Sequence, residues 1–177
     1  MQRLIRFGRF ALLASAVAVA QPAFAQAARA SGTVTVNRYL TYNAAAKTVA
    51  LTLVAGQGSA NGGMSFNGGF SGNQTITIPA GWTVSWQFTN QDAVPHSAVV
   101  LRDSMPLPAE PQGPAIPRAY TAHLTDGLPT NGTDATTFVA APAGAYVIAC
   151  GVPGHALSGM WIRLVVASGA AAPSYRM

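Results

Sequence analysis

Hydrophobic and polar residues alternate with a period of two along much of the chain. The clearest case is the segment WTVSWQFT at residues 82–89. Hydroxyl and amide side chains share one face of this segment, and the other face carries Trp82, Val84, Trp86 and Phe88. Antiparallel sheets with one packed and one solvated face produce this alternation. We therefore expect a strand here, with both tryptophans in the core.

Other short segments show the same strand pattern, and Gly and Pro residues separate them. They are TVTVNRYL (33–40), KTVALTLVAG (47–56), QTITIPAG (74–81), AYVIAC (145–150) and WIRLVVA (161–167). Helical periodicity is nearly absent, and charged residues make up only 8% of the chain. Many short strands with turn residues between them are typical of sandwiches and barrels. The sequence therefore predicts one all-β domain.

Three regions interrupt or end the strand pattern. Residues 56–73 are rich in Gly and Asn and are expected to form turns around a short strand. Residues 103–132 contain six prolines, and a loop of that length in a compact domain is usually functional or mobile. The end of the chain, SGAAAPSYRM at 168–177, is predicted to be a disordered tail. The domain itself is placed at residues 33–167.

The N-terminus has the three parts of a secretory signal. Three arginines lie in the first ten residues, a short apolar run follows, and Ala23 and Ala25 form a small-x-small cleavage site. We expect a signal peptide at residues 1–25 and export of the mature chain to the periplasm or outside the cell. The alternative is an uncleaved membrane tether, although the apolar run is shorter than the roughly 20 residues of a spanning helix.

Charge and cysteine content exclude several functions. The net charge of +5 falls to +2 without the three signal-peptide arginines, and no basic run or basic-aromatic cluster predicts nucleic-acid binding. The single cysteine, Cys150, excludes an internal disulfide. It also excludes a binuclear copper centre with two thiolates and the cysteine-rich zinc and iron–sulfur sites.

Candidate metal ligands cluster in IACGVPGHALSGMW at residues 148–161. Cys150, His155 and Met160 follow one another at intervals of five, between two predicted strands. A fourth candidate, His96, begins a strand in VPHSAVV. Two imidazoles, one thiolate and a weak axial thioether form the ligand set of type 1 copper, and the soft sulfur ligands favour copper over hard ions. These four residues therefore predict one copper site.

Each of these residues also has a simpler interpretation. Cys150 and Met160 could be ordinary core residues, and a histidine among apolar residues is more often packed or exposed than ligating. A Cys150–His155 nucleophilic pair is disfavoured because few acids are available to orient the histidine. A catalytic copper enzyme would need a second copper site, but the chain has only three histidines.

Several further residues are given structural roles. We expect His123 to lie on the surface. Met64 and Met105 could contact copper, but packing is the favoured role. Asp92 is predicted to be a turn residue and not an acid that contacts a ligand.

The sequence resembles the sulfocyanin family of the cupredoxin superfamily. The likeness covers residues 33–167 and rests on CGVPGHALSGMW and on FNGGFSGNQTITIPAGWTVSWQFTNQDAVPHS upstream. Rusticyanin-like proteins are similar in the same places, including the ligand spacing and the serine after the first histidine. The resemblance implies a cupredoxin-like Greek-key β-sandwich with one type 1 copper ion. His96, Cys150 and His155 would be its equatorial ligands and Met160 its axial ligand.

The resemblance also implies outer-sphere electron transfer. We expect an electron carrier, not an enzyme, that cycles between Cu(II) and Cu(I) and acts as a monomer between respiratory redox partners of the cytochrome or terminal oxidase type. Ser97 after His96, the methionine at the axial position and the apolar residues around the site predict a reduction potential at the high end for blue copper. Partners should approach His155 through the small apolar residues Val152, Pro153, Ala156 and Leu157. The alternatives are a copper-binding or chaperone protein and a sandwich without metal.

Overall fold

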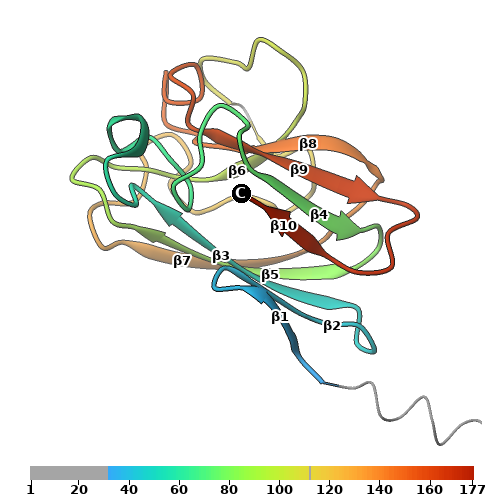
Figure 1. Ribbon diagram of the computed structural model, residues 1–177. Helices are drawn as coiled ribbons and strands as arrows, with labels where there is room; N and C mark the ends of the chain where they lie inside the picture. Colours follow the sequence, from blue (N-terminus) through green and yellow to red (C-terminus); the bar gives the residue numbers. More distant parts are fainter. Residues whose placement is uncertain (1–31, 112) are drawn as a thin grey trace, which may run out of the picture.

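Two β-sheets face each other in the protein, which is described here by a computed structural model (Figure 1). The structure describes residues 32–111 and 113–177, so the predicted signal peptide lies outside the described residues. A single 3₁₀ turn, η2 (Ala60–Gly63), is the helical element among the described residues. The predicted all-β fold is confirmed.

Each sheet has five strands. The first has the order β1 (Val34–Asn37), β2 (Leu40–Asn43), β3 (Thr48–Ala55), β5 (Thr83–Asn90) and β7 (Thr133–Val139). The second has the order β10 (Ser174–Arg176), β4 (Thr75–Pro79), β9 (Trp161–Ala167), β8 (Gly144–Ala149) and β6 (Val99–Arg102). Pairing is antiparallel except for β3 with β5 and β4 with β9, which are parallel. Both parallel pairs join strands that are distant in the sequence.

The core lies between the sheets and follows the predicted alternation. On β5, Val84, Trp86 and Phe88 are at most 1% exposed, whereas Gln87 between them is exposed. The parallel register places Leu51 beside Trp86, so apolar side chains of neighbouring strands share one face. Burial of one such side chain stabilises the fold by about 2 kcal/mol. Trp82 and Trp86 are both core residues, as predicted.

One end of the sandwich collects the loops that carry the candidate ligands. The register pairs Ala55 with Asn90 and Ala149 with both Val99 and Trp161. The segments at 56–73, 91–98 and 150–160 therefore all leave the sheets at the same end, at the upper left of Figure 1. A hydrogen bond joins two of them directly, because Asn61 Nδ2 donates to the Ser158 carbonyl at 2.9 Å.

The proline-rich segment 103–132 is attached along the outer edge of β6. Ala115 N–H donates to the carbonyl of Val100 at 2.7 Å, and Val100 N–H donates to the carbonyl of Ala119 at 2.9 Å. Ile116 within the segment is fully buried. The segment thus covers a sheet edge that would otherwise expose unpaired backbone groups.

The prediction of a disordered C-terminal tail is wrong. Within it, β10 pairs antiparallel with β4, and Tyr175 is only 9% exposed. The Tyr175 hydroxyl donates to Gln74 Oε1 at 2.7 Å and accepts from Asn67 Nδ2 at 3.0 Å. Burial raises the pKa of Tyr175 to about 12. A strand of three residues is too short to show an alternation of hydrophobic and polar positions in the sequence. The tail is ordered because it pairs with the free edge of β4.

Candidate metal centre

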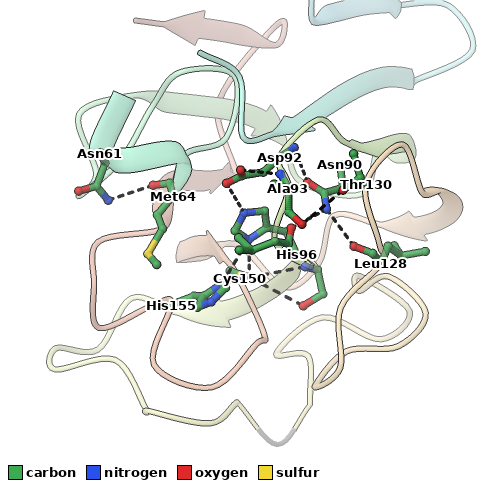
Figure 2. Close-up of polar contacts among 12 residues, drawn as sticks. Asn61, Met64, Asn90, Asp92, Ala93, His96, Leu128, Thr130, Cys150 and His155 are labelled. Atoms are coloured by element: carbon green, nitrogen blue, oxygen red, sulfur yellow. Dashed lines mark hydrogen bonds and ion pairs between the residues drawn. The ribbon is translucent and has the colours of Figure 1, made fainter. Parts of the chain in front are cut away.

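Three of the four predicted ligands bring their donor atoms together at the loop end of the sandwich. His96 Nδ1 lies 3.2 Å from His155 Nδ1, and Cys150 Sγ lies 3.8 Å and 3.5 Å from these two nitrogens. Figure 2 shows the two imidazole rings and the cysteine side chain converging on one point. Among the described residues, these three form the group of His, Cys, Asp and Glu side chains that could hold a metal ion.

The size of this triangle fits a single metal ion. A point equidistant from three atoms with these separations lies about 2.0 Å from each of them, and nitrogen and sulfur ligands bind first-row ions at about 2.0 to 2.3 Å. The donors are two imidazoles and one thiolate, which suit copper. Both the dimensions and the chemistry of the site therefore fit the predicted cofactor.

The sheet register positions the first two donors. Cys150 directly follows β8, and His96 lies three residues before β6, which pairs with β8. Both side chains are fully buried. The N–H of Ser97 donates to Cys150 Sγ at 3.5 Å, so the backbone next to one ligand contacts the other. Two strands of one sheet thus hold His96 and Cys150 side by side.

A compact turn brings in the third donor. Gly154 has a φ of +82°, which residues with a side chain rarely adopt, and His155 N–H donates to the carbonyl of Val152 at 3.1 Å. The loop closes where Cys150 N–H donates to the carbonyl of Met160 at 3.0 Å. His155 is partly exposed, unlike the other two donors.

Met160, the fourth predicted ligand, is fully buried in the same core cluster as Cys150. Its N–H donates to the carbonyl of His155 at 3.0 Å, so its backbone is tied to the ligand loop. The assignment of its sulfur as the axial ligand stays a prediction.

Burial controls the protonation of the site. Desolvation raises the pKa of the Cys150 thiol, against a smaller opposing effect of the hydrogen bond from Ser97 N–H. Desolvation, followed by the charge of His96, lowers the pKa of His155. Neutral imidazole is the form that binds metal ions, so the lowered pKa favours binding at neutral pH. The thiol would lose its proton to a bound cation.

Asp92 was predicted to be only a turn residue, and this prediction is wrong. Its N–H donates to Asn90 Oδ1 at 2.9 Å and its Oδ1 accepts from Ala93 N–H at 2.7 Å, as in a turn. However, its Oδ2 lies 3.0 Å from His96 Nε2 (Figure 2). The hydrogen bond with His96 also lowers the pKa of Asp92. A position four residues before a candidate ligand is the only sequence signal for this contact.

The remaining candidates differ in how deeply they are buried. His123 is exposed, as predicted, and does not belong to the three-residue cluster. Met105 is 51% exposed in the proline-rich segment. Met64 is partly buried and packs against the core, which agrees with the packing role expected for it.

Comparison with known proteins identifies the family. The model of the sulfocyanin (SoxE) domain matches residues 35–177. Sulfocyanin of Sulfolobus acidocaldarius is 37% identical over 139 residues, which cover 75% of this chain and 70% of that protein. A crystal structure of rusticyanin matches with a TM-score of 0.51 at 25% identity and covers 80% of this chain and 91% of the rusticyanin chain.

These matches agree with the cupredoxin-like Greek-key β-sandwich that was predicted. Within the described residues, no helix is long and apolar enough to cross a membrane. With a family match over most of its length and a His–Cys–His cluster of the right size, the chain belongs to the sulfocyanin family of cupredoxins, blue copper proteins whose cofactor is type 1 copper.

Proposed function

We propose that this protein is an exported electron carrier and not an enzyme. The observation that supports this most directly is the donor triangle of His96, Cys150 and His155, whose atoms lie within 4.8 Å of one another in a sulfocyanin-family chain. In this proposal His96, Cys150 and His155 are the equatorial ligands and Met160 is the axial ligand. The bound copper supplies a one-electron couple between Cu(II) and Cu(I).

The protein frame favours fast electron transfer because it restricts ligand movement. Cys150 and His96 are buried beside paired strands, and backbone hydrogen bonds close the loop that carries His155. A fixed ligand geometry needs little reorganisation when the charge of the site changes. No substrate is bound or transformed in this scheme.

Electrons would enter and leave beside His155, the partly exposed ligand. Pro153 and Leu157 on the same loop are exposed, and Leu157 is 56% exposed. Ala156 was expected on this surface but is buried, as part of a small cluster of apolar side chains that also contains Val99. The proposed contact surface is therefore small and apolar, as in weak redox encounters.

The partners would be redox proteins of the cytochrome or terminal oxidase type, and the carrier would act as a monomer. Location in the periplasm or outside the cell rests on the signal-like residues 1–25, with a membrane tether as the alternative if this segment is kept. The copper-binding domain would occupy residues 33–167, together with the strand β10 that completes its second sheet.

The visible absorption spectrum of the copper-loaded protein tests this proposal. We expect an intense thiolate-to-copper band near roughly 600 nm that disappears on reduction and is absent in Cys150→Ala. Fast electron self-exchange, measured by NMR line broadening in mixtures of both oxidation states, would separate a carrier from a copper chaperone. Tight copper binding without the band, or rapid copper release to a chelator, would contradict the carrier function.

A further inference from the structure

The Asp92 carboxylate lies in a closely packed corner between the 56–63 segment and the turn that leads to His96. Its side chain is 21% exposed, and both of its oxygens have partners: Ala93 N–H for Oδ1 and His96 Nε2 for Oδ2. Asn90 Oδ1 accepts from the Asp92 backbone N–H. The turn therefore fixes both the backbone and the carboxylate.

Two glycines leave the space that this carboxylate fills. A Cβ atom on Gly63 would lie 2.2 Å from Asp92 Oδ2, and a Cβ atom on Gly56 would lie 2.4 Å from Asp92 Cβ. Both glycines have positive φ values, +93° and +72°. Any side chain at these positions would push Asp92 away from His96. The contact is thus part of the packed structure and does not depend on a freely moving surface carboxylate.

The contact also determines where His96 carries its proton. An ionised carboxylate can only accept hydrogen bonds, so Nε2 of His96 must be the protonated nitrogen. The lone pair of Nδ1 then faces Cys150 and His155, where the donor triangle lies. Metal-ligating histidines commonly donate their second N–H to a carboxylate or carbonyl, which orients the ring and increases its basicity.

We propose that Asp92 is a positioning residue that orients His96 and lowers the reduction potential of the site. This inference rests on the proposed role of His96 as a copper ligand. A negative charge one imidazole ring away stabilises Cu(II) more than Cu(I), because Cu(II) carries the larger positive charge. Asp92 therefore opposes the buried, apolar surroundings on which the expectation of a high potential was based.

The test compares Asp92→Asn with Asp103→Asn. The first variant keeps the side-chain size and an oxygen that can accept from Nε2, but removes the charge. Asp103 supplies the control because it follows the far end of β6 and pairs with Arg163 at 3.0 Å. We expect Asp92→Asn to lose about tenfold in preference for Cu(II) over Cu(I), which raises the one-electron potential by about 59 mV. Asp103→Asn should leave the potential unchanged.

Equal potentials in the wild type and Asp92→Asn, with the roughly 600 nm band intact in both, would overturn the inference. An equal rise in Asp103→Asn would also overturn it, because the effect would then be one of general charge. A wild-type protein without the band would instead refute the proposed copper ligands. NMR of the reduced wild type needs no variant: we expect the His96 Nε2 proton shifted downfield by the carboxylate, and a solvated imidazole position would contradict the contact.

Discussion

His96 and His155 offer the same atom to the metal but occupy different surroundings. His96 is fully buried, and its second nitrogen contacts Asp92 at 3.0 Å. His155 is partly exposed on a short turn beside apolar residues. Their different burial suits the two histidines to different roles. The buried histidine can fix the geometry and potential of the site, and the exposed histidine can bring a partner close to it.

The largest expected effect comes from removing each ring in turn. Both His96→Gly and His155→Gly should lose the intense band near roughly 600 nm, because each removes one equatorial ligand. Added imidazole should restore the band in His155→Gly, where the space opens toward solvent, and not in His96→Gly, where the space is enclosed. Absorption titrations with imidazole would measure this difference. Equal rescue of both variants would contradict the separation of the two histidines.

A second comparison uses one glycine near each histidine. Gly63→Ala places a Cβ against Asp92 Oδ2, whereas Gly154→Ala, beside His155, meets no atom within 4 Å. Both variants must adopt a positive φ, which costs about 1–2 kcal/mol, and Gly63→Ala adds an overpacking cost of about 1–3 kcal/mol. Denaturant unfolding should therefore show the larger loss of stability in Gly63→Ala. Equal losses of stability would mean that Asp92 can move at little cost to make room for the Cβ in Gly63→Ala.

The sequence predicted the His155 side of the site better than the His96 side. Cys150, His155 and Met160 lie on one loop, so their spacing is visible in the sequence, as is the alternation on β5. Asp92 could not be assigned because its contact depends on how the chain turns between β5 and His96. The glycines that make room for it come from a distant segment.

Dependence on a distant segment also explains why the C-terminal tail was wrongly predicted to be disordered. Tyr175 follows a run of small residues that carries no strand period, and its ordered position depends on pairing with β4, about a hundred positions earlier in the chain. Local patterns thus predicted elements and the ligand set, whereas the pairing of β10 with β4 and the packing of Gly56 and Gly63 against Asp92 remained hidden until the fold was known.

A smaller effect is expected at Ser97, which links the two ligand segments. Its buried hydroxyl donates to the carbonyl of Leu124 at 2.6 Å and accepts from Gly151 N–H at 3.0 Å. Ser97→Ala would leave these groups without a partner and should cost about 1–3 kcal/mol. The matched control is Ser158→Ala. The exposed Ser158 hydroxyl donates to the carbonyl of Gly154, and its removal should cost less than about 0.5 kcal/mol of stability. Denaturant unfolding of both variants checks the difference.

Ser97→Ala should leave the band near roughly 600 nm almost unchanged, because the N–H that contacts Cys150 belongs to the backbone. A large spectral change would show that the hydroxyl itself acts on the thiolate, which lies 4.0 Å away.

The smallest expected effect is that of ionic strength on the rate of electron transfer beside the exposed histidine, His155. The residues flanking His155 on its loop are uncharged, and charged residues form 8% of the chain. Raising the ionic strength from 0.01 M to 0.15 M shortens the screening length from about 30 Å to about 8 Å. Stopped-flow rates with one anionic and one cationic small oxidant should each change by less than about threefold, since association without charge steering depends little on salt. Steep slopes of opposite sign would place a charged patch near the point of electron entry. In that case electrons would pass through a charged surface and not through the apolar one beside His155. The assignment of partner contact to His155 would then be contradicted.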